Sequence, residues 1–536
     1  MESGQASLKI NVEFNGHAGQ GAAASSVLDI PIQEKPVARK RSYGEILEAT
    51  VLIGGSSAIN LGVSVVRAKA MALLLGPAGV GLLALYSSIS DLVRTIAGLG
   101  INNSGVRQIA EAAGTGDTKC IARTVTVLRR VALGLGVLGA LLLVVMCRPV
   151  SLLTFGEYDH AGRIALLSLV VFFGAVMGGQ GALLRGMRRV ADIARLNVLG
   201  AVLGTAISIS VIYFYGEPGV VPALVGGAFV SVVTSWWYAR KVRVERVTVT
   251  ARDMSREAGL LLRLGLVFTA SALMTMGTAY ALRTLVLRHS GLEAAGLYQA
   301  AWAFGGIYVG FILQAMGVDF YPRLTAVAKN RDDCNRLVNE QAEIGLLLAG
   351  PGALATLALA PLVIRLFYSA QFDASVEILR WNCLGMILRV ASWPLGYVLI
   401  ARNEAWAFFW TELANSVVQI SLTWVGLLFW GVTGAGVAFF ASYLVYWAGI
   451  FLVVRQQTGF RWSAENRRIA LVWGALMGGV FSTWYWLPHN WSIALGVATT
   501  VVAGIYSLRL LVVLVPMERL PRFARGFLNL FKPAKG

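Results

Sequence analysis

The chain has 536 residues, of which 57% are hydrophobic and only 14% are charged. Since a typical soluble domain is about half apolar and about a quarter charged, this composition excludes a water-soluble globular enzyme, a disordered protein and a secreted disulfide scaffold. The chain carries 46 Lys and Arg against 28 Asp and Glu, a net charge of +18, and in a membrane protein such an excess indicates basic cytoplasmic loops. We therefore predict a membrane protein whose partners include membrane lipids and no nucleic acid.

Residues 1–44 are predicted to form a disordered cytoplasmic tail. Most of this segment is polar and rich in Gly, Ala and Ser, and it lacks the apolar core of a secretory signal peptide. Near its end lies the basic run Arg39-Lys40-Arg41, which favours a position on the cytoplasmic side of the membrane.

A series of apolar runs follows the tail, and each is long enough to cross a bilayer, which takes about 20 residues of helix. Turns rich in Gly and Pro, such as Gly76-Pro77 and Glu217-Pro218-Gly219, separate several of the runs and allow the chain to return at once. The runs predict an all-α polytopic membrane protein with about fourteen transmembrane helices. They cover residues 46–75, 78–106, 126–146, 164–184, 191–215, 218–238, 259–286, 292–318, 341–366, 376–400, 404–430, 432–454, 469–487 and 491–515.

The distribution of basic residues predicts the orientation. Both tails and the even-numbered connections hold most of the Lys and Arg residues, as in Arg129-Arg130 and Arg467-Arg468. The odd-numbered connections hold few, and Arg148 is one of them. Positive charge favours the cytoplasmic side, so both termini are expected there, in agreement with an even number of spans.

The first twelve runs divide into two lobes around a basic connection. Gly81-Leu82-Leu83 in the second run has a counterpart in Gly296-Leu297-Tyr298 in the eighth. Both lobes would start on the cytoplasmic side, which makes a parallel pseudo-repeat. We expect an N-terminal six-helix lobe at 45–239, a basic cytoplasmic linker at 240–258, a C-terminal six-helix lobe at 259–456, two extra C-terminal helices at 457–516 and a basic cytoplasmic tail at 517–536.

Four blocks carry a family resemblance. They are residues 67–82 around Gly76-Pro77, residues 99–111 around Asn102-Asn103, residues 319–326 around Pro322-Arg323, and residues 379–397 with Trp393-Pro394. Together they resemble the bacterial polysaccharide transporters of the O-antigen and enterobacterial common antigen type, which are flippases for lipid-linked oligosaccharides. That family belongs to the multidrug/oligosaccharidyl-lipid/polysaccharide exporter superfamily. The resemblance covers roughly residues 45–456.

Two features depart from that family. Its members commonly have twelve spans, and two more are predicted here. Where the family often has an acidic residue followed by Lys in the tenth helix, this chain has Met386 and Arg389.

Basic residues within the apolar runs are the candidate contacts for cargo. A charge near the bilayer centre costs about 2.5–3.5 kcal/mol on insertion scales, so it usually faces a partner, water or a ligand. Arg389 lies roughly 20 Å into its helix and has no acidic residue one turn away. The candidate substrate-binding residues are Arg67, Lys69, Arg94 and Arg389.

Two acidic residues, Asp91 and Glu412, are candidates for ion coupling. Asp91 stands three residues before Arg94 on one helix face, so an alternative is that the two charges neutralise each other. Trp residues gather in the tenth and eleventh runs, where they form interfacial belts or stack on sugar rings. They are Trp381, Trp393, Trp406, Trp410, Trp424 and Trp430.

The resemblance implies a flippase that moves undecaprenyl-pyrophosphate-linked oligosaccharide units from the cytoplasmic to the periplasmic leaflet of a bacterial inner membrane by alternating access. A polysaccharide polymerase and a chain-length regulator are its candidate protein partners. Alternatives are a lipid II flippase and an ion-coupled multidrug exporter, although a basic cavity argues against cationic drugs. A membrane polymerase or ligase would be expected to carry a long exterior loop with acidic residues, and none is predicted.

No cofactor, metal ion or catalytic residue is expected. The four Cys and four His residues are scattered without metal-binding spacing. The phosphate-binding pattern GxxxxGK[ST] is also missing from the sequence, so the chain carries no such ATP-driven motor.

Overall fold

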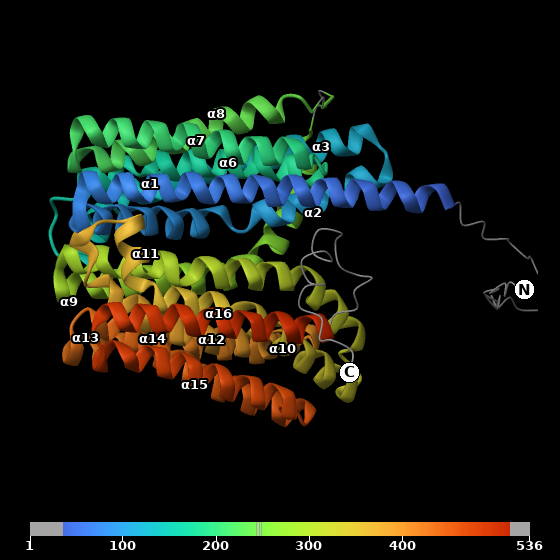
Figure 1. Ribbon diagram of the computed structural model, residues 1–536. Helices are drawn as coiled ribbons and strands as arrows, with labels where there is room; N and C mark the ends of the chain where they lie inside the picture. The colour runs from blue at the N-terminus through green and yellow to red at the C-terminus, as the bar shows by residue number, and fades with distance from the viewer. Residues whose placement is uncertain (1–35, 243, 246, 248, 515–536) are drawn as a thin grey trace, which may run out of the picture. The chain divides into compact units, whose positions relative to one another are not determined.

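The computed structural model describes residues 36–242, 244–245, 247 and 249–514, which form α-helices joined by short connections (Figure 1). Residues from Val51 onward form one compact unit, and residues up to Thr50 form a second one, of which the start of α1 is described. The C-terminal tail predicted at 517–536 and residues 1–35 lie outside the described ranges. Since α1 begins at Pro36, helical structure starts inside the segment predicted as a disordered tail.

The described helices follow one another with short connections between them. Those of the first half are α1 (Pro36–Gly98), α2 (Ile101–Thr115), α3 (Thr118–Val145), α4 (Cys147–Phe155), α5 (Ala161–Leu166), α6 (Ser168–Gly186), α7 (Val190–Tyr215) and α8 (Val220–Ala239). Those of the second half are α9 (Ala251–Val327), α10 (Arg331–Ala358), α11 (Ala360–Phe367), α12 (Ser375–Ala401), α13 (Ala405–Trp430), α14 (Thr433–Thr458), α15 (Ala464–Trp486) and α16 (His489–Leu514). Two 3-10 segments, η1 (Glu217–Gly219) and η2 (Ala370–Phe372), complete the described elements.

Eleven helices in the described ranges are long and apolar enough to cross a membrane, so the predicted number of fourteen is not confirmed. The difference arises at the two longest helices. The runs 46–75 and 78–106 are joined in α1, which provides a single candidate, Gly54–Gly98. The runs 259–286 and 292–318 are joined in α9, which is not among the eleven. The second run also ends earlier than predicted, because Leu99 and Gly100 both adopt positive φ and α2 begins after them.

Each of the two longest helices is interrupted once by a glycine. Gly76 has φ 63° and ψ −172°, and Gly291 has φ 87° and ψ 176°. Both conformations lie in a region that side chains with a Cβ rarely adopt, so glycine at these positions permits a sharp reversal of the chain. Pro77 follows Gly76 directly and starts the next helical segment, where its missing N–H is not required.

The segments after these two breaks cross at a second pair of glycines. A Cβ placed on Gly81 would lie 2.4 Å from the carbonyl oxygen of Leu292, and one placed on Gly296 would lie 1.8 Å from that of Pro77. The contact is reciprocal, because Pro77 precedes Gly81 by the same number of residues as Leu292 precedes Gly296. Backbone therefore packs directly on backbone where the first half of the chain meets the second.

The ends of the helices define two sides of the bundle. We call the end with Gly76, Gly156, Gly291 and Gln371 the Gly76 side, because a Cβ on Gly76 would lie 3.1 Å from Gln371 Oε1 and one on Gly156 would touch Arg288. The opposite end, which carries the turn at Asp117, is called the Asp117 side.

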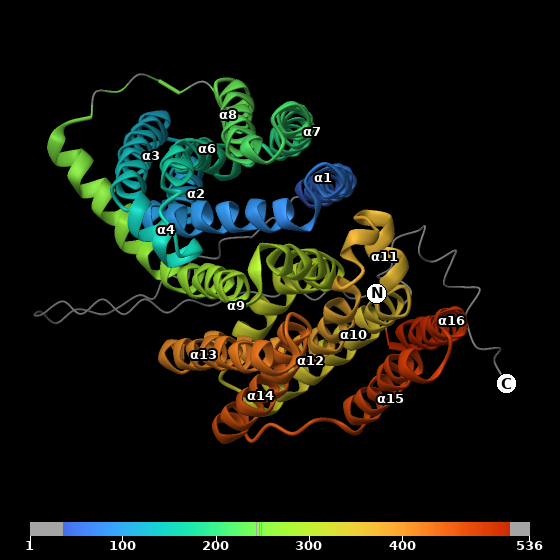
Figure 2. The same cartoon turned by 90° about the vertical axis from the view of Figure 1, so that its left-hand side faces the viewer.

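Helix packing groups most elements by their order in the chain. In the first half α6 contacts α2, α3 and α8, and α7 lies beside α8; in the second half α12 contacts α10, α13 and α14 (Figures 1 and 2). The first part of α9 is an exception, because it packs on the first half. Arg123 of α3 forms ion pairs with Asp253 and Glu257, the latter at 3.0 Å, and the Tyr280 hydroxyl lies 2.6 Å from that of Thr154.

The two C-terminal helices pack on α10 and α12. The ring of Trp473 in α15 is fully buried against Gly350, where a Cβ would lie 2.3 Å from the indole. The buried Arg380 of α12 donates a hydrogen bond of 2.6 Å to the carbonyl oxygen of Phe481. Its guanidinium also lies over the ring of Trp484, at 4.7 Å from the centroid. A cation over aromatic rings is favourable and ties α15 to α12.

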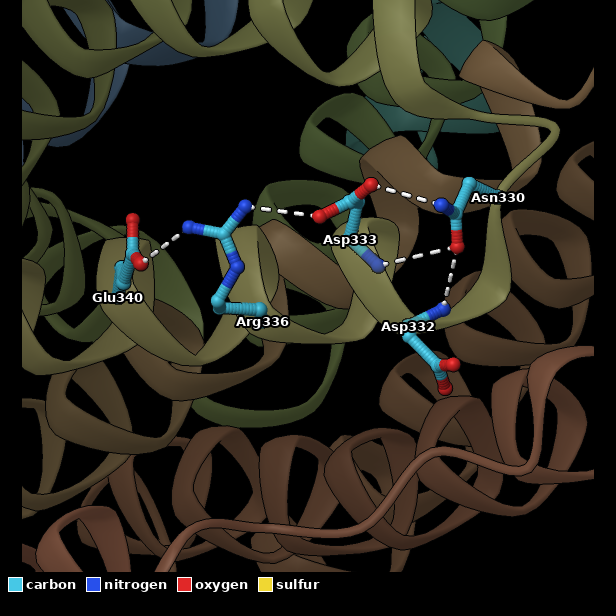
Figure 3. Close-up of polar contacts among 5 residues, drawn as sticks. All are labelled: Asn330, Asp332, Asp333, Arg336 and Glu340. Atoms are coloured by element: carbon cyan, nitrogen blue, oxygen red, sulfur yellow. Dashed lines mark hydrogen bonds and ion pairs between the residues drawn. The ribbon is translucent and has the colours of Figure 1, made fainter.

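Polar caps fix helix starts on the Asp117 side. At α10 the Asn330 side chain accepts hydrogen bonds from the N–H groups of Asp332 and Asp333, at 3.1 and 3.4 Å (Figure 3). Arg336 then bridges Asp333 and Glu340, at 2.8 and 3.2 Å. These contacts satisfy otherwise unpaired N–H groups and place acidic charge at the positive end of the helix.

Candidate functional site

A cavity of about 1000 Å³ lies between helices of the second half and the first part of α9. Its walls come from α9, α12, α13 and α14, with Asn103 of α2 at its margin. Since the first part of α9 packs on the first half of the chain, the cavity is bounded by both halves. A volume of this size lies at the upper end of the range for small-molecule binding sites.

Polar side chains line two facing walls at helical spacing. On α13 they are Glu412, Asn415, Ser416 and Gln419, and on α9 they are Ser271, Thr275 and Thr278. Residues three or four positions apart lie on one face of a helix, so each set forms a stripe along its helix. Both helices are otherwise largely apolar, and the stripes give the cavity its hydrogen-bonding capacity.

Arg389 of α12 is half-buried in the cavity wall. Within the described ranges its guanidinium has no carboxylate at ion-pairing distance and takes part in no hydrogen bond. The guanidinium carbon lies 5.9 Å from the centroid of the Tyr443 ring. The charge predicted to lack a local partner is therefore unpaired in the fold as well, and an anion entering the cavity can reach it.

Arg283 of α9 faces the same cavity and was missed as a site residue. The predicted span ended at residue 286, and Arg283 was counted at a helix end beside a connection, whereas α9 continues to the break at Gly291. Its Nε donates to Gln299 Oε1 at 2.9 Å, and Nη1 donates to the carbonyl oxygen of Ala279 at 3.1 Å. Both of these hydrogen-bond partners are neutral groups.

Glu412 is the acidic residue of the cavity lining. Its Oε1 accepts a short hydrogen bond of 2.6 Å from the hydroxyl of Tyr446 on α14. A carboxylate with a hydroxyl donor in a partly enclosed cavity has the chemistry to take up and release a proton.

Aromatic side chains line the part of the cavity towards the Asp117 side. The rings of Trp393 and Tyr397 lie 4.3 Å apart, and Tyr321 lies 5.8 Å from Tyr397. Of the six Trp residues considered from the sequence, Trp393 lines the cavity. Trp381 packs against Phe440 and Phe481. The remaining four are exposed at the helix surface and fit interfacial belts: Trp406, Trp410, Trp424 and Trp430.

The other candidate residues lie outside the cavity lining. Asp91 and Arg94 form an ion pair at 2.9 Å, the alternative left open by the sequence, and both side chains are almost half exposed. Arg67 is half-buried and takes part in no hydrogen bond or ion pair recorded for the described residues.

Lys69 joins the two halves at the Gly76 side. Its ammonium donates to the carbonyl oxygen of Arg365 at 2.9 Å and to that of Tyr368, both at the end of α11. Cations are stabilised at helix C-termini, where carbonyl groups lack helical partners. Arg365 in turn binds Asp373 through two hydrogen bonds of 3.0 and 2.7 Å, and it holds the pKa of the Asp373 carboxyl below its usual value.

Across the described ranges, no group of three or more His, Cys, Asp or Glu residues could hold a metal ion. The signal that could have located the cavity was the pair of polar stripes. Ser271, Thr275 and Thr278 recur on an apolar helix, and so do Asn415, Ser416 and Gln419. A search for uncharged polar residues at helical spacing would have found both walls.

Comparisons with known proteins agree with this architecture. A family profile described as "Polysaccharide biosynthesis protein" matches residues 70–377, more than half of the chain. Among curated proteins, the lipid III flippases of Escherichia coli (strain K12) and Shigella flexneri are each 26% identical over 422 residues, which covers 77% of this chain and 99% of the relative.

Solved structures show the same fold. One is a multidrug resistance MATE family transporter of the MOP superfamily in an inward-facing conformation, with a TM-score of 0.64 and 18% identity over 74% of this chain and 94% of that chain. Another is the lipid II flippase MurJ in an inward closed conformation, with a TM-score of 0.60 and 12% identity over 86% of this chain and 98% of that chain. The chain thus has the helical fold of these membrane transporters.

Proposed function

Because the chain belongs to the polysaccharide biosynthesis protein family, we propose that it translocates undecaprenyl-pyrophosphate-linked oligosaccharide units from the cytoplasmic to the periplasmic leaflet of a bacterial inner membrane. The chain is a multi-pass membrane transporter of the flippase type and not an enzyme. The observation that carries the proposal is the unpaired guanidinium of Arg389 in a cavity bounded by both halves of the chain.

The charge distribution of the cavity matches such a cargo. Arg389 of α12 and Arg283 of α9 both line the cavity, and a pyrophosphate offers several oxygens to each guanidinium. The polar stripes can bind sugar hydroxyls while the prenyl tail stays in lipid. Lys69 and Arg94 already have partners in this conformation. The proposal therefore assigns the first cargo contact to Arg389 and Arg283 and leaves Arg67 as a further basic contact along α1.

The proposed architecture has fourteen spans in two six-helix lobes of parallel pseudo-repeat, followed by two extra helices. The breaks at Gly76 and Gly291 support this count, because each would let a long helix cross the membrane twice. The reciprocal contact between Gly81 and Gly296 supports an axis between the lobes along the membrane normal. Rocking of the lobes about this contact would alternate access to the cavity.

The Asp117 side is proposed to face the cytoplasm, in agreement with the basic residues there, and both termini would lie on that side. After the four native cysteines are replaced, a single cysteine introduced in place of Asp117 or Glu404 should not be labelled by an impermeant maleimide in intact cells. Single cysteines at Asp159 or Asn490 should react with it. Labelling of the cysteine at position 117 from outside the cell would contradict a cytoplasmic position of the Asp117 side. Arg246 and Arg525, two other positions predicted to be cytoplasmic, lie outside the described residues.

Glu412 and Asp91 are the proposed ion-coupling residues, and Glu412 is favoured by its place in the cavity. Glu412→Gln keeps the side-chain size but removes the titratable carboxyl, so pH-driven transport in proteoliposomes should fall strongly. Asp91→Asn tests the second candidate, which already pairs with Arg94. The matched control is Glu404→Gln at the exposed start of the same helix. Unchanged pH-driven transport by the Glu412→Gln protein would remove Glu412 from this role.

A lipid II flippase is the second candidate function, favoured by the structural likeness to MurJ. A third candidate, an ion-coupled multidrug exporter, fits the shared fold, but the two arginines in the cavity lining do not suit a cationic drug. Bacterial strains that each lack one flippase pathway distinguish these functions. Expression of this chain should restore surface polysaccharide in a strain without an oligosaccharide flippase and should not rescue a strain without a lipid II flippase. A polysaccharide polymerase and a chain-length regulator are proposed as protein partners.

A further inference from the structure

The cavity has two chemically different regions along α12. Arg389 marks the charged region, and Trp393 and Tyr397 follow it on the same helix face. At 1.5 Å per residue, their Cα atoms lie about 6 and about 12 Å further along the helix axis, towards the Asp117 side. A ligand that places an anionic group on Arg389 can therefore reach Trp393 with its next chemical group.

The ring of Trp393 is held in place before any ligand binds. The fully buried Phe320 lies 5.9 Å from it between ring centroids, and Tyr397 lies 4.3 Å away. Gly317 supplies the space, since a Cβ there would lie 3.4 Å both from the Trp393 ring and from the Tyr397 hydroxyl. Rings fixed in this way lose little freedom on binding a ligand.

One hydrogen-bonding group without a partner among the described residues lies in the lining of the same cavity. Asn415 lines the same cavity, and its Oδ1 is buried without a hydrogen-bond partner in the described structure. A buried acceptor of this kind is costly unless a ligand or water donates to it. A prenyl chain has no donor, whereas a sugar combines hydroxyl donors with an apolar ring face.

We propose that Trp393, Tyr397 and Tyr321 form a saccharide-binding platform, on which the sugar next to the pyrophosphate stacks while Asn415 accepts a hydrogen bond from a sugar hydroxyl. This inference rests on the proposed function and adds an orientation to it. The pyrophosphate lies on Arg389 and the glycan extends towards the Asp117 side. Selection among cargoes then depends on the first sugar as well as on the phosphate charge.

The test compares two ligands that differ only in the sugar. Purified protein in nanodiscs is titrated with undecaprenyl pyrophosphate and with undecaprenyl-pyrophosphate-linked N-acetylglucosamine. Trp393→Leu should weaken binding of the sugar-bearing ligand about five- to tenfold, since an aromatic contact of this kind is worth about 1 kcal/mol or somewhat more. Its affinity for undecaprenyl pyrophosphate should change less than twofold, and Trp393→Phe should recover most of the lost affinity.

Trp406→Leu is the matched control, because Trp406 is 74% exposed and lies outside the cavity lining. It should leave the affinities for both ligands unchanged. If Trp393→Leu weakened the binding of both ligands equally, or weakened the binding of neither ligand, the platform would be overturned while the proposed function stayed intact. If the unmodified protein bound neither ligand, the proposed function itself would fail, and the platform with it.

Discussion

Replacing Arg389 with alanine is expected to abolish transport of the lipid-linked oligosaccharide while leaving the protein folded and inserted in the membrane. The guanidinium lines the cavity without a carboxylate partner among the described residues, so its removal leaves no opposite charge unpaired in the protein. In the loaded state the same change leaves a bound pyrophosphate without its contact. Loss of one partner of a buried charge pair costs about 2–5 kcal/mol, enough to stop measurable export.

Two variants sharpen this expectation. Arg389→Lys keeps the charge but loses the planar group that can contact two oxygens at once, so it should retain part of the activity. Arg509→Ala is the control, because Arg509 is exposed on α16 away from the cavity and its loss should leave export normal. Export is measured as surface polysaccharide, with expression checked in the same membranes. Normal export by a well-expressed Arg389→Ala protein would exclude Arg389 from cargo binding.

Gly296→Ala is expected to destabilise the protein and to stop transport, although it adds only one methyl group. The new Cβ would lie 1.8 Å from the carbonyl oxygen of Pro77, which is backbone and cannot rotate away. The two helices would have to separate where the halves of the chain meet, and overpacking of this kind costs about 1–3 kcal/mol or more. A lower melting temperature in detergent and loss of export are the expected readouts.

The same two helices provide controls for the glycine substitution. A Cβ on Gly310 in α9 or on Gly98 in α1 would meet nothing within 4 Å. Gly310→Ala and Gly98→Ala should therefore melt at the temperature of the unmodified protein or slightly above it, because alanine favours the helix. If Gly296→Ala melted with these controls, the close crossing of the two helices would not exist in the protein.

Much of the helical arrangement could be predicted from the apolar runs and the turns between them. Gly76-Pro77 marked the first reversal because Gly and Pro have strong local effects on the backbone. The ends of the runs were less certain, since hydropathy does not fall where a helix ends. The span predicted to end at residue 286 continues to Gly291. Arg283, which was assigned to a helix end beside a connection, therefore lies further inside the helix and lines the cavity.

The partners of the intramembrane charges could be predicted only in part. Arg389 was correctly expected to lack a neighbour on its own helix, which depends on spacing alone. Lys69 looked similar in the sequence, but its partners are the carbonyl oxygens of Arg365 and Tyr368. Every residue has such an oxygen, and these lie almost three hundred positions away in the chain. Only the folded structure brings these groups together.

The contact between Gly81 and Gly296 has a consequence for the origin of the chain. In a symmetric homodimer, residues on the two-fold axis meet their own copies. Gly81 and Gly296 meet in this way within one polypeptide. Gly81 contacts the carbonyl oxygen of Leu292, and Gly296 contacts that of Pro77. The arrangement is what duplication and fusion of a gene for a self-associating half-size ancestor would leave behind. Under this proposal, the ancestor would need a single glycine to form both sides of the crossing, whereas the fused chain would need two.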